Sequence, residues 1–174
     1  MRKEKGFTLI EILIYLFVVG VVASLVMVFF SNIISSFGRI SEKNFLQTNL
    51  QSSMDFIISQ AREAKSIYTK TSIFNTDSGQ LSLETKKDPP VGHSKTYIDF
   101  YLDNGVLYQK REIDSLPVAI TPFRVKVTKF FIERFTLPSG KEIVKITIGA
   151  EYNSLKPKKA GYELSSSVTL RGAY

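Results

Sequence analysis

The sequence predicts an α+β fold, in which one long N-terminal helix packs on an antiparallel β-sheet. Residues 12–30 form an uncharged apolar run, which passes into a stripe of apolar residues spaced three or four positions apart as far as about Tyr68. Beyond Tyr68, apolar and polar residues alternate with a period of two, and turn residues separate the alternating runs. A chain of 174 residues has room for one domain and a long extension.

The apolar run from Ile12 to Phe30 contains no charged residue and no proline. At about 1.5 Å per residue it spans roughly 28 Å as a helix, close to the hydrocarbon thickness of a bilayer. We therefore expect a helix that crosses a membrane once. Because Arg2, Lys3 and Lys5 precede the run, the N-terminus should stay cytoplasmic and the residues after Phe30 should lie outside. A cleavable secretory signal is the alternative, but the residues after Phe30 match its cleavage pattern poorly.

The amphipathic stripe follows the apolar run without a proline break, and polar residues such as Glu42 and Gln47 occupy the other positions. It predicts a single helix of about sixty residues that ends against a soluble head, with the stripe used for packing. Gly20 is the weak point of this helix, and Gly38 is where we expect a bend. The stripe consists of Ile33, Phe37, Ile40, Leu46, Leu50, Met54, Ile57, Ala61 and Ala64.

Two hairpins dominate the second half of the chain. Asn104-Gly105 lies between alternating runs, and both residues tolerate the positive φ angles of a tight hairpin turn. A second pair of runs surrounds Pro138-Ser139-Gly140. Successive hairpins imply an antiparallel sheet with the amphipathic helix on one face. Residues 85–94 and 155–161 contain prolines and should be exposed loops. The expected strands are residues 80–84, 96–102, 106–112, 123–137, 142–152 and 162–170.

Residues 5–11 read Lys-Gly-Phe-Thr-Leu-Ile-Glu and precede the long apolar run. This segment resembles the class III signal of type IV pilins and type II secretion pseudopilins. The resemblance implies that prepilin peptidase cuts between Gly6 and Phe7, and that Phe7 is then N-methylated. It divides the chain into a cytoplasmic leader (1–6), a transmembrane and assembly helix (7–30), its amphipathic continuation (31–68) and a pilin-like β-sheet head (69–174).

Glu11 is an acidic residue in an apolar helix, where a carboxylate costs roughly 2.5–3.5 kcal/mol on insertion scales. It lies four residues after Phe7, so its carboxylate could meet the amine that cleavage creates. The resemblance implies that this glutamate engages the N-terminus of a neighbouring subunit during assembly. Pairing within the same chain is a second interpretation. The third is that Glu11 lies at the cytoplasmic interface or favours the helix start electrostatically.

Two patterns resemble the J-type minor pseudopilins and the W-type minor pilins. One is residues 50–56 followed by residues 61–64 in the amphipathic helix, and the other is residues 166–171 at the end of the head. The implied function is that of a minor structural subunit of a type IV pilus or a type II secretion pseudopilus. Its implied partners are prepilin peptidase, other pilins or pseudopilins, the inner-membrane assembly platform and membrane lipid. The implied location is the cytoplasmic membrane, crossed once, with the head outside and possible incorporation into a filament.

The composition offers few of the side chains that catalytic and metal sites require. The chain has no cysteine, and His93 is its one histidine, beside a glycine in an expected loop. Cysteine-based metal sites, cysteine nucleophiles and histidine-rich zinc sites therefore cannot form. No Walker loop, dinucleotide fingerprint or nucleophile elbow occurs. We expect no catalytic residue, no metal site and no cofactor, and a protein that is not an enzyme.

Basic residues leave open a second function, that of a DNA-uptake pilin with a DNA-contacting head. The formal net charge is +7, and Tyr97, Tyr101 and Tyr108 alternate near some of the lysines. Lysines also commonly solvate loops and edge strands, which is the simpler interpretation. A third possibility is a membrane-tethered domain with no filament role. The basic clusters are Lys86-Lys87, Lys110-Arg111, Lys126 with Lys129, and Lys156 with Lys158-Lys159.

Overall fold

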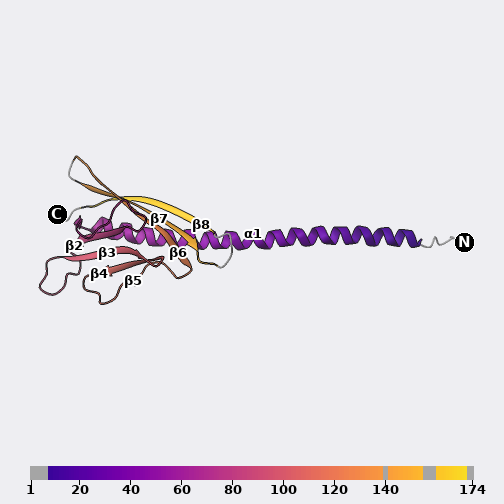
Figure 1. The fold of residues 1–174 in the computed structure, drawn as a ribbon, viewed down its shortest axis with the longest axis horizontal. Helices are drawn as coiled ribbons and strands as arrows, with labels where there is room; N and C mark the ends of the chain where they lie inside the picture. Colours follow the sequence, from indigo (N-terminus) through magenta and orange to yellow (C-terminus); the bar gives the residue numbers. More distant parts are fainter. Residues whose placement is uncertain (1–7, 139–140, 155–159, 172–174) are drawn as a thin grey trace. The chain divides into compact units, whose positions relative to one another are not determined.

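A computed structural model describes residues 8–138, 141–154 and 160–171 of the chain (Figure 1). The chain divides into two compact units, Met1–Ser41 and Glu42–Tyr174. In the first unit every described residue after Thr8 is helical. The second unit, called the head below, contains the rest of the helix and all the strands.

Helix α1 runs from Leu9 to Glu63 and passes through Gly20 and Gly38 as one helix of 55 residues. It ends five residues before the position that the stripe suggested. After Ala64 the main chain exchanges helical hydrogen bonds for sheet bonds: the Lys65 N–H donates to the Glu84 carbonyl at 2.8 Å. Ser66–Ile67 then form β1, a two-residue strand. The helix end was predicted too late because apolar residues keep the three-to-four spacing past Ala64, at Ile67 and Tyr68.

Five antiparallel strands form the first sheet, in the order β1-β2-β3-β4-β5. They are β1 together with β2 (Gln80–Thr85), β3 (Thr96–Asp103), β4 (Val106–Arg111) and β5 (Val118–Ala119). Asn104 and Gly105 link β3 to β4 with φ angles of 48° and 79°, which confirms the predicted tight hairpin. β1 and β5 were not predicted, because two residues are too few to show alternation.

The last three strands form a second antiparallel sheet in the order β6-β7-β8. They are β6 (Val125–Thr136), β7 (Glu142–Tyr152) and β8 (Gly161–Thr169). The sequence predicted one sheet, whereas the structure divides the strands between two. The α+β class, the long helix and the antiparallel pairing are confirmed.

The two sheets meet where the segment before β2 runs beside β6. The Gly79 N–H donates to the Phe130 carbonyl at 2.9 Å, and the Phe130 N–H donates to the Asp77 carbonyl at 2.7 Å. At the β3–β4 turn, the Val127 N–H donates to the Gly105 carbonyl at 2.8 Å. These main-chain bonds join the two sheets into one head.

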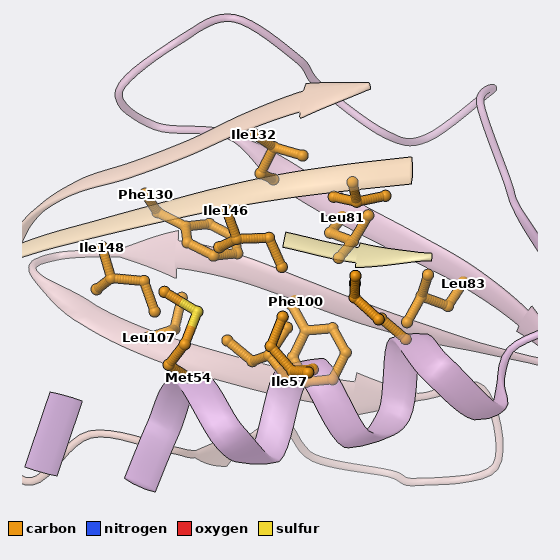
Figure 2. Packing of buried hydrophobic residues seen from close by; sticks show 14 of the residues in the cluster. Met54, Ile57, Leu81, Leu83, Phe100, Leu107, Phe130, Ile132, Ile146 and Ile148 are labelled. Atoms are coloured by element: carbon orange, nitrogen blue, oxygen red, sulfur yellow. The ribbon is translucent and has the colours of Figure 1, made fainter. Parts of the chain in front are cut away.

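The core of the head lies between the buried stripe of α1 and both sheets (Figure 2). Met54 and Ile57 point from the helix toward Phe100 and Leu107 of the first sheet and toward Phe130 and Ile148 of the second. The predicted stripe is confirmed from Leu46 onward. Its buried members are Leu46, Leu50, Met54, Ile57, Ala61 and Ala64.

The earlier part of the stripe is not core. Ile33 is half-buried, while Phe37 and Ile40 are exposed. These residues belong to the first unit, in which α1 has no other described element to pack against. The assignment of Phe37 and Ile40 to packing within the chain was therefore wrong.

Candidate functional site: the N-terminal assembly segment

The helix begins with a side-chain cap at Thr8. Leu9 is the first helical residue, and the Glu11 N–H donates to the Thr8 Oγ1 at 3.3 Å. The Glu11 and Ile12 N–H groups also donate to the Thr8 carbonyl, at 3.1 and 3.3 Å. Thr8 is thus the N-cap residue, and Glu11 is the third residue of the first turn. This Thr-x-x-Glu spacing is that of a capping box, a signal that was present in the sequence but was missed.

Glu11 is half-buried and is the acidic residue of the first helical turn. A carboxylate there is favourable because the unpaired N–H groups of a helix start carry partial positive charge. The structure therefore places Glu11 where a negative charge stabilises the helix. Gly6 and Phe7 lie outside the described residues, so cleavage, methylation and a contact between Glu11 and the new amine stay predictions.

The helix after Glu11 is apolar on all sides. An 18-residue window has a mean hydropathy of 2.9, and none of its residues is buried. Soluble helices keep a polar face toward water, which this segment lacks. Its length and composition are sufficient to cross a membrane.

Apolar surface continues along α1 beyond Phe30. Phe29, Ile33, Phe37 and Ile40 recur at helical spacing and, with Asn32 and Ser36, line a shallow groove of about 290 Å³. We call these six residues the groove stripe. The spacing was recognised in the sequence, but it shows only that the residues share a face.

The described part of the chain contains no group of three or more histidine, cysteine, aspartate or glutamate residues that could hold a metal ion. His93 is exposed in a turn, where its N–H donates to the Pro90 carbonyl at 2.9 Å.

Several of the basic residues considered for DNA binding form ion pairs with carboxylates of the head. The Lys87 Nζ lies 3.3 Å from the Glu63 Oε2, and the Lys129 Nζ lies 3.2 Å from the Glu163 Oε1. The Arg111 Nη1 lies 3.7 Å from the Asp88 Oδ2. Within the described ranges, Lys86, Lys110 and Lys126 are exposed and form no ion pair. The cluster of Lys156, Lys158 and Lys159 lies outside the described residues.

One acidic group of the head is buried and was not singled out in the sequence. The Glu84 carboxylate on β2 lies 3.3 Å from the Lys65 Nζ and 3.2 Å from the Lys95 Nζ. Burial raises the pKa of Glu84, but the hydrogen bonds and charges of Lys95 and Lys65 outweigh burial, so its pKa lies below the ordinary value of 4.5. This group ties β2 to the residues before β1 and β3, which indicates a structural role.

Residues 1–27 match the prokaryotic N-terminal methylation motif. No curated protein and no solved structure matches the chain. The motif marks a class III signal, which implies processing by prepilin peptidase and assembly with other pilins. Together with the apolar helix, it fits a protein anchored in the inner membrane. The match therefore supports a structural subunit of the type IV pilin or pseudopilin kind.

Proposed function

We propose that the protein is a minor pilin or minor pseudopilin, cut between Gly6 and Phe7, methylated on Phe7 and assembled into a membrane-anchored filament through its N-terminal helix. The observation that carries this proposal is the methylation motif at residues 1–27, which leads directly into a capped, apolar helix. The J-type or W-type subtype, and a place near the filament tip or in its initiation, rest on the sequence resemblance alone.

Cleavage after Gly6 would place a charged amine one residue before the Thr8 cap. A positive charge at this end of a helix is unfavourable because the helix start is itself partly positive. The Glu11 carboxylate offsets both charges. At 4 Å and an effective dielectric constant of ~20, an amine–carboxylate pair contributes up to ~4 kcal/mol before desolvation is subtracted. In a filament the amine of one subunit would meet Glu11 of the next.

The groove stripe gives assembly a second surface. Phe37 is 69% exposed, and Phe29 and Ile40 are more than half exposed. Side chains at this spacing pack into the grooves of neighbouring helices. We infer that the helices of sister subunits cover this stripe in the filament.

Mass spectrometry of the mature N-terminus tests the proposal. In cells with an active prepilin peptidase, we expect a chain that begins with N-methylated Phe7. Gly6→Leu should retain the leader, because a bulky side chain would obstruct the backbone in the peptidase cleft. An unmodified Met1 start in the wild type would contradict the proposal, and so would normal maturation of Gly6→Leu. A membrane-tethered domain without a filament role would keep its anchor but lack the methylated start.

A DNA-contacting head is the second candidate. The rings of Tyr101 on β3 and Tyr108 on β4 are stacked, with their centroids 5.9 Å apart. The exposed Lys110 follows Tyr108 by two residues on the same strand. Aromatic rings beside cations can hold single-stranded nucleic acid. Fluorescence anisotropy with labelled single-stranded DNA should then show binding by the detergent-solubilised chain that weakens as salt rises. Absence of binding at low salt would remove this candidate.

A further inference from the structure

An open groove of about 610 Å³ lies in the head beside the end of helix α1. Three cationic side chains line it: Arg62 from the last turn of α1, Lys141 just before β7, and Arg171 just after β8. The rest of the lining is residues 167–170 at the end of β8. Among the described residues no acidic side chain lines the groove, so its lining carries a charge of +3. We call it the basic groove.

The two carboxylates next to these cations in the sequence are bonded elsewhere. The Glu63 Oε2 lies 3.3 Å from the Lys87 Nζ. Glu142 accepts a hydrogen bond from the Arg134 Nε at 3.0 Å and another from the Ile67 main-chain N–H at 3.1 Å. Within the described ranges, the three cations of the basic groove form no ion pair. Their charges are therefore not compensated by the part of the protein that the structure describes.

Two of the cations face each other across a pair of strands. The Leu170 N–H donates to the Glu142 carbonyl at 3.1 Å, so the pairing of β7 with β8 continues beyond the two strands. The next pair in this register sets Lys141 opposite Arg171. Like charges directly opposite each other in antiparallel strands are destabilising. An anion bound in the groove would relieve this repulsion.

The free edge of β8 adds neutral donors to the basic groove. Ser167 and Thr169 are exposed while Val168 between them is buried, so the two hydroxyls lie on the solvent side of the strand. The Arg171 N–H points away from β7 and donates to the Arg62 carbonyl at 3.4 Å. Because antiparallel residues alternate, the Thr169 N–H also points away from β7. β8 is an edge strand, and no main-chain acceptor for this N–H occurs among the described residues.

We propose that the basic groove binds a phosphate monoester of a small polar molecule, with the phosphate group held among Arg62, Lys141 and Arg171. A phosphate monoester carries a charge of about −1.5 to −2 at pH 7 and has three strong acceptor oxygens. A carboxylate has a single charge and two oxygens, so it would leave more of the positive charge uncompensated. Arginine side chains match the geometry of phosphate, because the planar guanidinium donates two parallel hydrogen bonds.

The remainder of the groove holds the polar body of the ligand, against the hydroxyls of Ser167 and Thr169. The volume of the groove lies within the range of roughly 300–1,000 Å³ that is usual for small-molecule sites. The groove is remote in sequence from the methylation motif and plays no part in the function proposed above. Binding there would be a further property of the head.

The test uses the full chain in detergent micelles and follows NMR signals during titration. The probes, compared at the same ionic strength, are glucose 6-phosphate, glucose and succinate. With glucose 6-phosphate we expect saturable shifts at the Thr169 N–H and at the Nε–H groups of Arg62 and Arg171. Glucose should cause none, because it has no phosphate group. Succinate has two separate carboxylates and should bind at least about fivefold more weakly.

Matched variants locate the binding. Arg62 and Arg171 are exposed, so neutral glutamine can replace either without opening the core. Arg62→Gln and Arg171→Gln should each weaken binding of glucose 6-phosphate about fivefold or more. Lys126→Gln removes the same charge from an exposed residue of β6 outside the groove and should leave binding unchanged.

Three results would overturn the proposal. The first is the absence of a saturable shift with glucose 6-phosphate. The second is equally tight binding of glucose or succinate, since the groove would then not select a phosphate group. The third is equal binding by Arg171→Gln and Lys126→Gln, because net charge rather than the basic groove would then decide the affinity.

Discussion

Glu84 shows how single residues hold the head together. Its buried carboxylate accepts hydrogen bonds from Lys65 and Lys95, two lysines that come from different segments of the chain. Removing the charge breaks both ion pairs and leaves a neutral amide in place of the carboxylate. Glu84→Gln should therefore lower the free energy of unfolding by roughly 1–3 kcal/mol at neutral pH. Glu63→Gln, which breaks the exposed pair with Lys87, should change it by about 0–1 kcal/mol.

The same residue predicts a pH dependence. The folded state lowers the pKa of Glu84, so its contribution to stability is complete above the ordinary carboxyl value of 4.5. The contribution is lost as the pH falls through the lower pKa of the folded state. Urea unfolding at neutral and acid pH should show the difference between wild type and Glu84→Gln shrinking on acidification. A difference that is constant with pH would show that the charge of Glu84 is not what stabilises the head.

Two of the three interpretations of Glu11, a role in assembly and a role at the helix start, can be separated by a pair of variants. Glu11→Gln keeps the size of the side chain and removes the charge, whereas Thr8→Ala removes the cap and keeps the charge. If the carboxylate serves assembly, Glu11→Gln should insert in the membrane but be lost from filaments. Thr8→Ala should assemble, with helix stability lower by about 0.5–2 kcal/mol.

Quantitative blotting of membrane and sheared-filament fractions measures both variants. Equal loss from filaments in the two variants would assign Glu11 to the helix start, and wild-type incorporation of Glu11→Gln would leave its charge without a role in assembly.

The Thr8 cap could have been predicted from the Thr-x-x-Glu spacing. The partner of the Glu11 carboxylate could not, because it depends on an amine that only processing creates.

At the scale of elements, helix α1 shows what spacing alone can predict. The residues at three-to-four spacing from Leu46 to Ala64 are buried, as the sequence suggested. Ile33, Phe37 and Ile40 have the same spacing, but Phe37 and Ile40 remain exposed. Periodicity identifies the apolar face of a helix and says nothing about which element covers it. The two-residue strands β1 and β5 could not be predicted from spacing, because they form by pairing with a neighbouring strand where the sequence has no alternating pattern.

Ile57 tests the buried part of α1. It is fully buried against both sheets, so Ile57→Ala removes apolar contacts and leaves a cavity. We expect the free energy of unfolding to fall by about 2–5 kcal/mol. Asp55→Ala, on the exposed side of the same helical turn, is the control and should have little effect. Urea titrations followed by tyrosine fluorescence measure both; an unchanged midpoint for Ile57→Ala would mean that the helix does not close the core.

At the scale of the molecule, the division of the strands into two sheets was beyond sequence analysis. The hairpin around Asn104-Gly105 is a local signal, and its prediction was correct. The junction between the sheets depends on Gly79 and Phe130, which lie far apart in the chain and show no pattern in common. In the sequence, Phe130 is typical of a strand and Gly79 is typical of a turn. Only their approach in space gives the glycine a role.

Gly79→Ala tests this junction. A Cβ at position 79 would lie 2.7 Å from the Phe130 carbonyl oxygen and 3.1 Å from the Ile73 carbonyl oxygen, so main chain would have to move. We expect a loss of about 1–3 kcal/mol in unfolding free energy, as in other overpacked sites. Gly161→Ala is the control, because its Cβ would meet only the Ala150 carbonyl oxygen, at 3.8 Å. Equal stability of the two variants would show that the sheets are not held at this point.

The place where burial begins along α1 has a consequence for how such proteins diversify. Phe45 is the first residue of the helix that packs against the core, and Leu46 is the first that is fully buried. Among the residues that the structure describes, the hydrophobic core of the head therefore consists of residues from Phe45 onward. A recombination event upstream of Phe45 would join an inherited anchor to an unrelated head without disturbing the interior of either. Exchange of gene segments at this point would give one N-terminal segment a range of different head surfaces.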